Sequence, residues 1–253
     1  MNLFKRFYIG FIFTFLYLPI FILIVYSFNN SKYSLNWKGF TLKWYEKLFE
    51  NESLIEAALN SITIAALSSF VATILGLIGA VALYRYKFAG KKFLSSIVFI
   101  LIISPEIVTG IALLMLFVIF NTELGFSSLL ISHISFCLPF VMVTIMSRLS
   151  GFDKNIIEAA SDLGASDFEI FSKVILPNIF PAVVAGFLLS FTLSLDDVII
   201  SFFVSGVEFE ILPIKIFSMV KLGVSPEVNA LSTIMFIFTI CVVAFSQFLI
   251  RKH

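Results

Sequence analysis

Six long apolar runs constrain the fold of this chain more than any other feature of its sequence. They lie at roughly 7–28, 58–84, 93–120, 127–149, 180–203 and 229–250. Each has about 18 residues or more, which is enough for a helix to cross a hydrocarbon core of about 30 Å. Because lipid cannot satisfy backbone N–H and C=O groups, we expect these spans to be helices. The sequence therefore predicts an all-α, polytopic membrane protein with six transmembrane helices and a single transmembrane domain over residues 1–253.

The composition excludes a soluble globular chain. Apolar residues make up 60% of the 253 residues and charged residues only 13%, whereas about a quarter of the residues in soluble domains are charged. The first run follows Lys5-Arg6, like the apolar part of a signal peptide, but it is too long and no A-x-A site follows it. We expect it to be retained as a signal anchor. We expect no metal site and no nucleic-acid partner.

The lysines and arginines predict how the chain is oriented in the membrane. If the N-terminus is inside, 11 of the 17 basic residues lie on the cytoplasmic side: Lys5, Arg6, Arg85, Lys87, Lys91, Lys92, Arg148, Lys154, Lys173, Arg251 and Lys252. The other six lie in two longer loops, where the positive-inside rule is weak. We therefore expect both termini on the cytoplasmic side of a cell (inner) membrane.

A polar interruption at residues 153–177 separates the fourth and fifth apolar runs. Asp153 can cap a first short helix. Gly164 stands where that helix should end, because glycine adopts the left-handed C′ conformation without a Cβ clash. Ser166 and Glu169 have the spacing of a capping box at the start of a second short helix. Pro177 is expected to end that second helix.

This interruption resembles the EAA loop of binding-protein-dependent ABC importer permeases. The matching residues are Glu158-Ala159-Ala160, Gly164 and Val174-Ile175-Leu176-Pro177. The family has isoleucine where this chain has Val174. The resemblance implies a type I (MetI-like) ABC importer permease fold, in which Glu158, Ala159, Ala160 and Gly164 couple the membrane helices to an ATPase. An ordinary capped loop between two helices is the alternative interpretation.

Three carboxylates lie inside the apolar runs. Glu106 is about 20 Å along the third run when counted from Phe93, and Asp196 and Asp197 are about 23 Å along the fifth run when counted from Pro181. A carboxylate at such depth is costly unless it faces a cavity or a partner, and no buried lysine or arginine is available to pair with these. We favour a cation pathway, and structural hydrogen bonding at a helix end is the alternative.

Small residues predict where the helices pack closely. Gly76 and Ala80 are four residues apart in the second run, and a stripe in the fifth run consists of Ala182, Gly186, Ser190 and Ser194. Such residues allow helices to approach one another. Asp197 lies near this stripe, whereas Asp196 points about 100° away and projects toward a cavity or the opposite wall.

His133 is more typical of an interhelical hydrogen bond than of a switch.

Trp44 in the first outer loop has two interpretations. With Trp37 and Tyr45 it can belong to an aromatic belt at the membrane interface. Alternatively, its ring offers a π face to an arriving cation. The sequence favours the belt and leaves the second interpretation open.

The chain has no phosphate-binding loop of its own. The Gly90-Lys91 pair is the nearest candidate, but Arg85 stands where the first glycine of a Walker A motif is required. We therefore expect no cofactor on this chain. If ATP drives its activity, ATP and magnesium are bound by a partner ATPase.

Further stretches resemble the permeases of spermidine/putrescine importers within the same family. They are GFTLKWYEKL, VALYRYKFAGKKF, SPEIV, SHISFCLPFV, SFTLSLDDVIISFFV and ILPIKIFSMVKLGVSPEVNALST. This resemblance implies polyamine as the substrate and a set of partners. Those partners are a second permease of the PotB type, two copies of an ATPase of the PotA type, and a substrate-binding protein of the PotD type.

The same resemblance implies a set of residues for polyamine uptake. The matching positions are Trp44, Glu106, Asp167, Ser194, Asp196 and Asp197. One member of the family has aspartate where this chain has Glu106, which keeps the charge and lengthens the side chain by one methylene. Two rival functions use other machinery: a cation channel or ion-coupled carrier without an ATPase, and a structural membrane subunit without a pathway.

Overall fold

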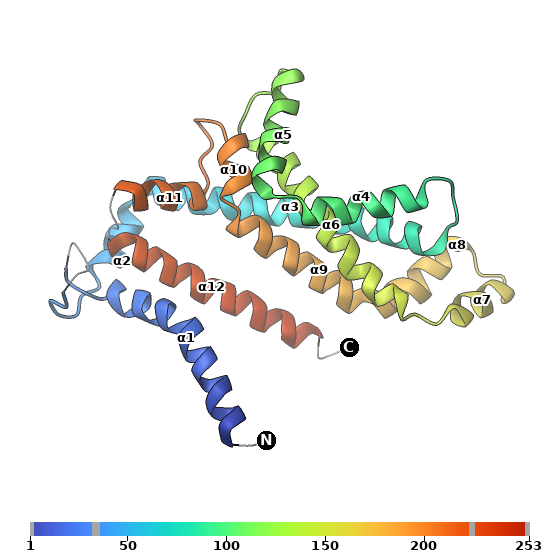
Figure 1. Cartoon of the computed structure of the whole chain (residues 1–253), viewed down its shortest axis with the longest axis horizontal. Helices are drawn as coiled ribbons and strands as arrows, with labels where there is room; N and C mark the ends of the chain where they lie inside the picture. The colour runs from blue at the N-terminus through green and yellow to red at the C-terminus, as the bar shows by residue number, and fades with distance from the viewer. Residues whose placement is uncertain (1–2, 32–35, 223–225, 251–253) are drawn as a thin grey trace. The chain divides into compact units, whose positions relative to one another are not determined.

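The computed structural model describes residues 3–31, 36–222 and 226–250. Lys32, Arg251 and Lys252, which enter the predicted orientation, lie outside these ranges. An isolated antiparallel bridge joins Asn29 and Phe40. The regular elements are helices, drawn in Figure 1: α1 (Leu3–Ser27), α2 (Lys43–Glu50), α3 (Glu52–Arg85), α4 (Lys91–Ile103), α5 (Glu106–Ile119), α6 (Phe126–Ser150), α7 (Lys154–Asp162), α8 (Asp167–Glu169), the π-helix η1 (Ile170–Ile175), α9 (Leu176–Asp196), α10 (Ile199–Val204), α11 (Leu212–Leu222) and α12 (Pro226–Ile250).

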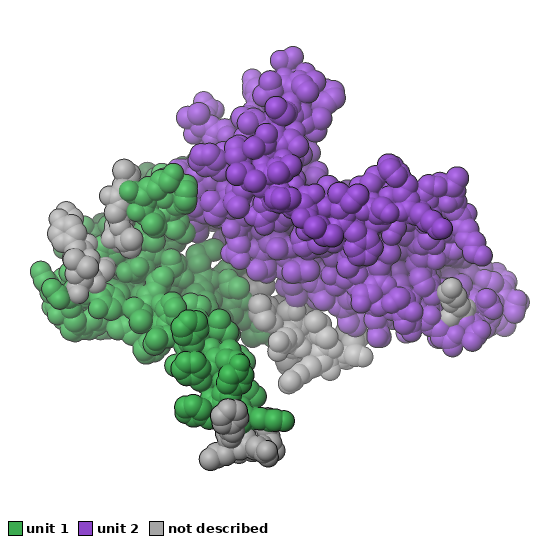
Figure 2. Space-filling view, viewed as in Figure 1, with its two compact units in different colours: residues 1–56, 215–244 green, residues 57–214, 245–253 purple. Residues whose placement is uncertain are grey.

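The chain divides into two compact units, which Figure 2 colours separately. The first unit consists of residues 1–56 and 215–244, and the second of residues 57–214 and 245–253. Helices α3, α11 and α12 each contribute residues to both units. The single domain over residues 1–253 stays a prediction.

Helix length and hydropathy confirm an all-α membrane protein. By these two properties the described residues contain four helices able to cross a membrane, at Phe7–Ser27, Glu52–Arg85, Phe126–Ser150 and Asp167–Asp196. Helices α4 and α5 add a fifth if the pair counts as one broken span. The sixth predicted run falls on α12, whose apolar stretch Pro226–Cys241 is shorter. The count of six spans stays a prediction.

The third predicted span is broken in its middle. Helices α4 and α5 are bent by 112° relative to each other. Between them Ser104 and Pro105 have extended ψ angles of 134° and 132°. Proline disfavours the helical conformation in the residue before it and has no N–H of its own. The predicted position of Glu106 along one straight helix is therefore wrong.

The fifth span differs from its prediction at both ends. Pro177 does not end the second short helix, because α8, η1 and α9 form one continuous 30-residue helix, Asp167–Asp196. In an α-helix a proline ring clashes with the carbonyl four residues before it, and the wider π-helical turn of η1 changes that geometry. At the other end α9 stops at Asp196 and α10 starts at Ile199. This predicted span is also broken.

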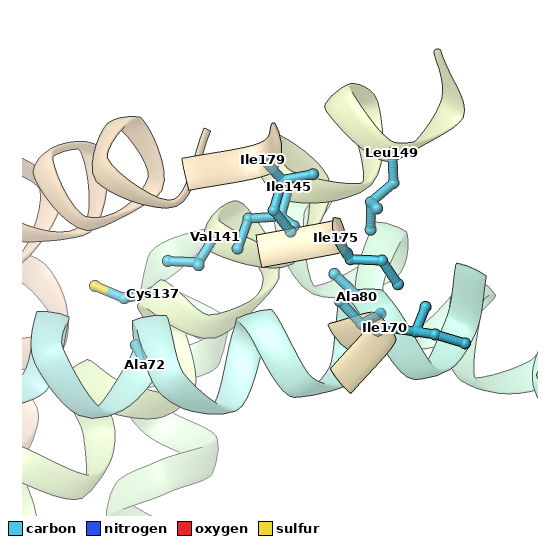
Figure 3. Packing of buried hydrophobic residues seen from close by; sticks show 10 residues of the cluster. Ala72, Ala80, Cys137, Val141, Ile145, Leu149, Ile170, Ile175 and Ile179 are labelled. Carbon is cyan, nitrogen blue, oxygen red and sulfur yellow. The ribbon is translucent and has the colours of Figure 1, made fainter. Parts of the chain in front are cut away.

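The core of the second unit lies where α3, α6, η1 and α9 pack together. Figure 3 shows its buried side chains, among them Ala72, Ala80, Cys137, Val141, Ile145, Leu149, Ile170, Ile175 and Ile179. Val141 of α6 fits between two glycines. A Cβ atom on Gly76 of α3 would lie 2.7 Å from Val141 Cγ1, and one on Gly186 of α9 would lie 3.3 Å from it. The predicted close packing through small residues is confirmed.

Helices α5 and α10 pack against each other beyond the two breaks, and they lie side by side in Figure 1. Gly110 of α5 provides the closest approach. A Cβ atom there would lie 2.8 Å from the ring atom Cδ2 of Phe203 and 3.3 Å from Cα of Ile200. The two short helices therefore form a joint element whose contact depends on the absence of a side chain at Gly110.

Candidate functional site

A pocket of about 300 Å³ lies in the second unit at the two helix breaks. Its lining comes from α5, α6, α9, the segment after α9 and the start of α10: Glu106, Phe136, Leu189, Thr192, Leu193, Asp196, Asp197, Val198 and Ile199. The structure thus brings together the three acids that the sequence analysis singled out. It does so by bending the backbone, and not through equal depth along two straight helices as expected.

Glu106 and Asp196 are the two acids of this pocket with exposed side chains. Within the described residues neither side chain has a hydrogen bond or an ion pair with another residue. The pocket wall around them is largely apolar, and Phe136, Leu189 and Leu193 contribute to it. A carboxylate only accepts hydrogen bonds when ionised, so this arrangement offers acceptors separated by apolar surface. It suits a cationic ligand with apolar segments between its charges.

Asp197 is different, because its side chain is turned into the protein. The residue is only 6% exposed. Its carboxylate accepts hydrogen bonds from the backbone N–H of Ile200 at 3.2 Å and of Ser201 at 2.7 Å, and from the Ser201 hydroxyl at 2.7 Å. It therefore caps the start of α10. Of the two interpretations of the acidic pair, the structural one fits Asp197 and the pocket-facing one fits Asp196.

A buried polar cluster lies behind Asp197. His133 of α6 is 1% exposed. Its Nδ1 is 2.6 Å from the hydroxyl of Ser194, and its Nε2 is 2.9 Å from the hydroxyl of Ser201 and 3.6 Å from Asp197 Oδ2. Ser194 also bonds to Ser68 of α3 at 3.0 Å. The predicted interhelical role of His133 is confirmed, and Ser194 lies within this cluster and is not part of the pocket lining.

Trp44 lies in the first unit and is not among the residues that line this pocket. It is 6% exposed, and its indole N–H donates to the backbone carbonyl of Asn29 at 2.8 Å. The ammonium groups of Lys43 and Lys47 lie 6.0 Å and 5.5 Å from its ring centroid. The ring is therefore a buried anchor of the segment between α1 and α3, whereas Trp37 is 52% exposed, as an interfacial residue would be.

The caps predicted for the polar interruption are present in the structure, although its second helix continues past Pro177. The Asp153 carboxylate caps α7 by accepting from the N–H of Asn155 at 3.0 Å. Gly164 has a φ of +80°, in the left-handed region. The capping box is complete: Glu169 N–H donates to the Ser166 hydroxyl at 3.3 Å, and Ser166 N–H donates to the Glu169 carboxylate at 3.0 Å.

Helix α7 presents one face to the protein and another away from it. Ile157 and Ala160 are half-buried and pack against the core shown in Figure 3. Glu158 and Ala159 are exposed. Large apolar side chains of the same polar interruption are also exposed, namely Ile156 at 46%, Leu163 at 89% and Phe168 at 75%. A patch of this kind on a polar loop is typical of a protein-binding surface.

Asp167 lies at the start of α8 and contacts the end of α3. Its carboxylate forms an ion pair with the guanidinium of Arg85, whose second Nη donates to the Asp167 backbone carbonyl at 3.4 Å. Sequence reasoning missed this pair, because the two residues are 82 positions apart and neither has a local signal for the other. It also missed Thr192 in the pocket lining, which stands four residues before Asp196 and so on the same helix face.

Comparison with known proteins assigns the family. A family model described as a binding-protein-dependent transport system inner membrane component matches residues 72–252. The chain belongs to this family. It is a transporter permease subunit of the inner membrane and not an enzyme, and its EAA loop is a feature of that family. Of the three functions considered from the sequence, the match supports the importer permease.

Individual relatives agree with this assignment. The chain is 57% identical to the spermidine/putrescine transport system permease protein PotC of Escherichia coli K12, over 95% of this chain and 91% of that protein. It is 42% identical to the putrescine transport system permease protein PotI of the same organism, over 88% and 82%. Its fold matches a chain of a bacterial alginate-importing ABC transporter with a TM-score of 0.77 at 18% identity, covering 96% and 94%. The fold is that of a type I ABC importer permease.

Proposed function

We propose that this chain is the permease subunit of an ATP-driven importer that brings spermidine and putrescine into the cytoplasm. The observation that carries the proposal is the pocket in which Glu106 and Asp196 lie exposed and unpaired among apolar walls. A polyamine at neutral pH is a chain of protonated amines separated by methylenes. Carboxylates at intervals bind its charges, and the walls of Phe136 and Leu193 contact its methylenes.

Three of the four remaining residues implied by the family resemblance have other roles in this proposal, and Asp167 is considered separately below. Asp197 and Ser194 support the pocket from behind, through the cap of α10 and the cluster around His133. Trp44 fixes the first outer loop through its bond to Asn29. Weak and separated contacts suit transport, since the substrate must leave the pocket as well as enter it.

The partners follow from membership of a binding-protein-dependent family. An ATPase and a substrate-binding protein complete such an importer, and we infer that they are of the PotA and PotD types, with a PotB-type second permease completing the pathway. ATP and magnesium bind to the ATPase dimer. The exposed residues Glu158 and Ala159, with the exposed Leu163 and Phe168 of the same segment, provide the surface on which that ATPase docks. Both termini then lie in the cytoplasm, in agreement with the positive-inside rule.

The proposal is tested by uptake of labelled spermidine and putrescine into proteoliposomes that contain the assembled importer. Glu106→Gln and Asp196→Asn each remove one charge with little change in shape. Losing one charge-assisted contact should lower transport efficiency by about tenfold to a hundredfold, equivalent to about 1.5–3 kcal/mol. Glu123→Gln, an exposed acid outside the pocket lining, is the matched control and should transport like the parent. If both pocket variants also transport like the parent, the cation pathway lies elsewhere.

A further inference from the structure

The end of α3 holds the polar interruption at two points. The Tyr84 hydroxyl donates to the backbone carbonyl of Phe152, just before α7, at 3.2 Å. Arg85 pairs with the carboxylate of Asp167 at the start of α8 and donates to its backbone carbonyl. All four residues belong to the second unit. Two neighbouring residues of α3 thus contact both sides of the segment that carries α7.

The burial of the Arg85–Asp167 pair is uneven. The Arg85 side chain is 14% exposed, whereas that of Asp167 is 70% exposed. A guanidinium that has lost most of its water needs partners in the protein, and Arg85 finds both a carboxylate and a carbonyl on a single residue. This two-point contact fixes the direction of the α8 backbone as well as its position. A solvent-exposed pair between two mobile side chains would do neither.

Asp167 is also far from the pocket along its own helix. The helix Asp167–Asp196 has 30 residues, so its two ends are about 44 Å apart at 1.5 Å per residue. A polyamine in contact with Asp196 does not reach Asp167. The role in uptake that the family resemblance implies for Asp167 therefore needs a physical account other than contact with the substrate in that pocket.

We infer that Arg85 and Tyr84 are positioning residues that clamp the coupling loop, residues 153–168, to α3. Asp167 then contributes to uptake because its contact with Arg85 is one of the two points of this clamp. The inference rests on the proposed coupling of this loop to an ATPase. The loop is continuous with α9 through η1, and the clamp adds a second attachment to α3. A displacement of α7 is then passed to α3 and α9 together, and both contribute to the core around Val141. Without the clamp, α9 receives the displacement and α3 follows only through side-chain packing.

A charge exchange tests the clamp in the assembled importer. Arg85→Asp and Asp167→Arg each place like charges together, and the double variant restores an opposite pair. We expect each single variant to lower maximal uptake and uptake per ATP hydrolysed by roughly five- to tenfold with KM for the polyamine unchanged, and the double variant to regain most of that loss. Asp162→Arg, an exposed residue at the end of α7, is the control for added charge on this loop.

A second readout keeps the test independent of the substrate. Amide hydrogen exchange of residues 153–168 in the assembled importer should be faster in both single variants and return toward the parent rate in the double variant. Raised KM with unchanged uptake per ATP would indicate that Asp167 contacts the substrate and would overturn the inference. Equal exchange in the parent and the single variants would overturn it as well. Absence of polyamine uptake by the parent would instead contradict the proposed substrate and leave the exchange result to decide on the clamp.

Discussion

The acidic pair at the end of α9 gives a sharp prediction, because the structure assigns two adjacent carboxylates to different tasks. Asp197→Asn should destabilise the protein, whereas Asp196→Asn should leave its stability unchanged. Asp197 accepts three hydrogen bonds, from the N–H of Ile200, the N–H of Ser201 and the hydroxyl of Ser201. Asp196 accepts none from the described residues.

The size of the effect follows from what an amide can replace. Asparagine keeps one acceptor oxygen and places an NH₂ group where the other carboxylate oxygen was. In the better orientation the oxygen still receives both bonds from Ser201, and the NH₂ group faces the N–H of Ile200. At least one charge-assisted bond is lost in a buried site, which costs about 1.5–3 kcal/mol. An exposed substitution such as Asp196→Asn usually stays within about 0.5 kcal/mol.

The measurement is thermal unfolding of the purified importer complex in detergent, with both variants prepared in parallel. Uptake is measured on the same preparations at matched assembly. We expect Asp197→Asn to unfold at a lower temperature than the parent, and Asp196→Asn to unfold like the parent while it transports poorly. Equal thermal stability of all three proteins would refute the assignment of Asp197 as the cap of α10.

Two glycines give further predictions. Gly164→Val places a β-branched residue at a φ of +80° with open space around its Cβ, so its cost is backbone strain of about 1–2 kcal/mol. We expect ATPase-coupled uptake to fall while membrane insertion stays normal. Asparagine tolerates this conformation, so Gly164→Asn should retain more activity than Gly164→Val. Gly110→Val should separate α5 from α10 and lower the free energy of unfolding by about 1–3 kcal/mol, because its Cβ meets Phe203 and Ile200. Gly10→Val, with nothing within 4 Å, is the control in the same unfolding measurement.

Local signals made the caps of the polar interruption at residues 153–177 predictable. The caps at Asp153, Gly164 and Ser166 satisfy backbone groups within four residues of themselves, so their chemistry can be recognised in a short stretch of sequence. The helix breaks were not predictable in this way. Pro19 and Pro139 lie inside continuous helices, whereas Pro105 accompanies a bend of 112°. The same residue type gives both outcomes, because neighbouring helices decide whether the freed carbonyl finds another partner.

The roles of the site residues were only partly predictable, because they depend on contacts between residues that are far apart in the sequence. The three acids were recognisable because a carboxylate in an apolar run is costly wherever it falls. Their division into two exposed acids and one buried cap depends on the break after Asp196, which turns Asp197 inward. The contact of Arg85 with Asp167 depends on how α3 and α8 meet. Neither fact is contained in the spacing of the residues concerned.

The two helix breaks and the pocket have a common physical basis. A broken helix at membrane depth exposes backbone N–H groups, and these are tolerated only where protein or a cavity satisfies them. At the second break, Asp197 satisfies the N–H groups of Ile200 and Ser201. At the first, Glu106 occupies the first turn of α5, where a negative charge is favourable next to the helix N-terminus. Asp197 is therefore engaged within the protein, and the charge left for a cation in this pocket comes from Glu106 and Asp196.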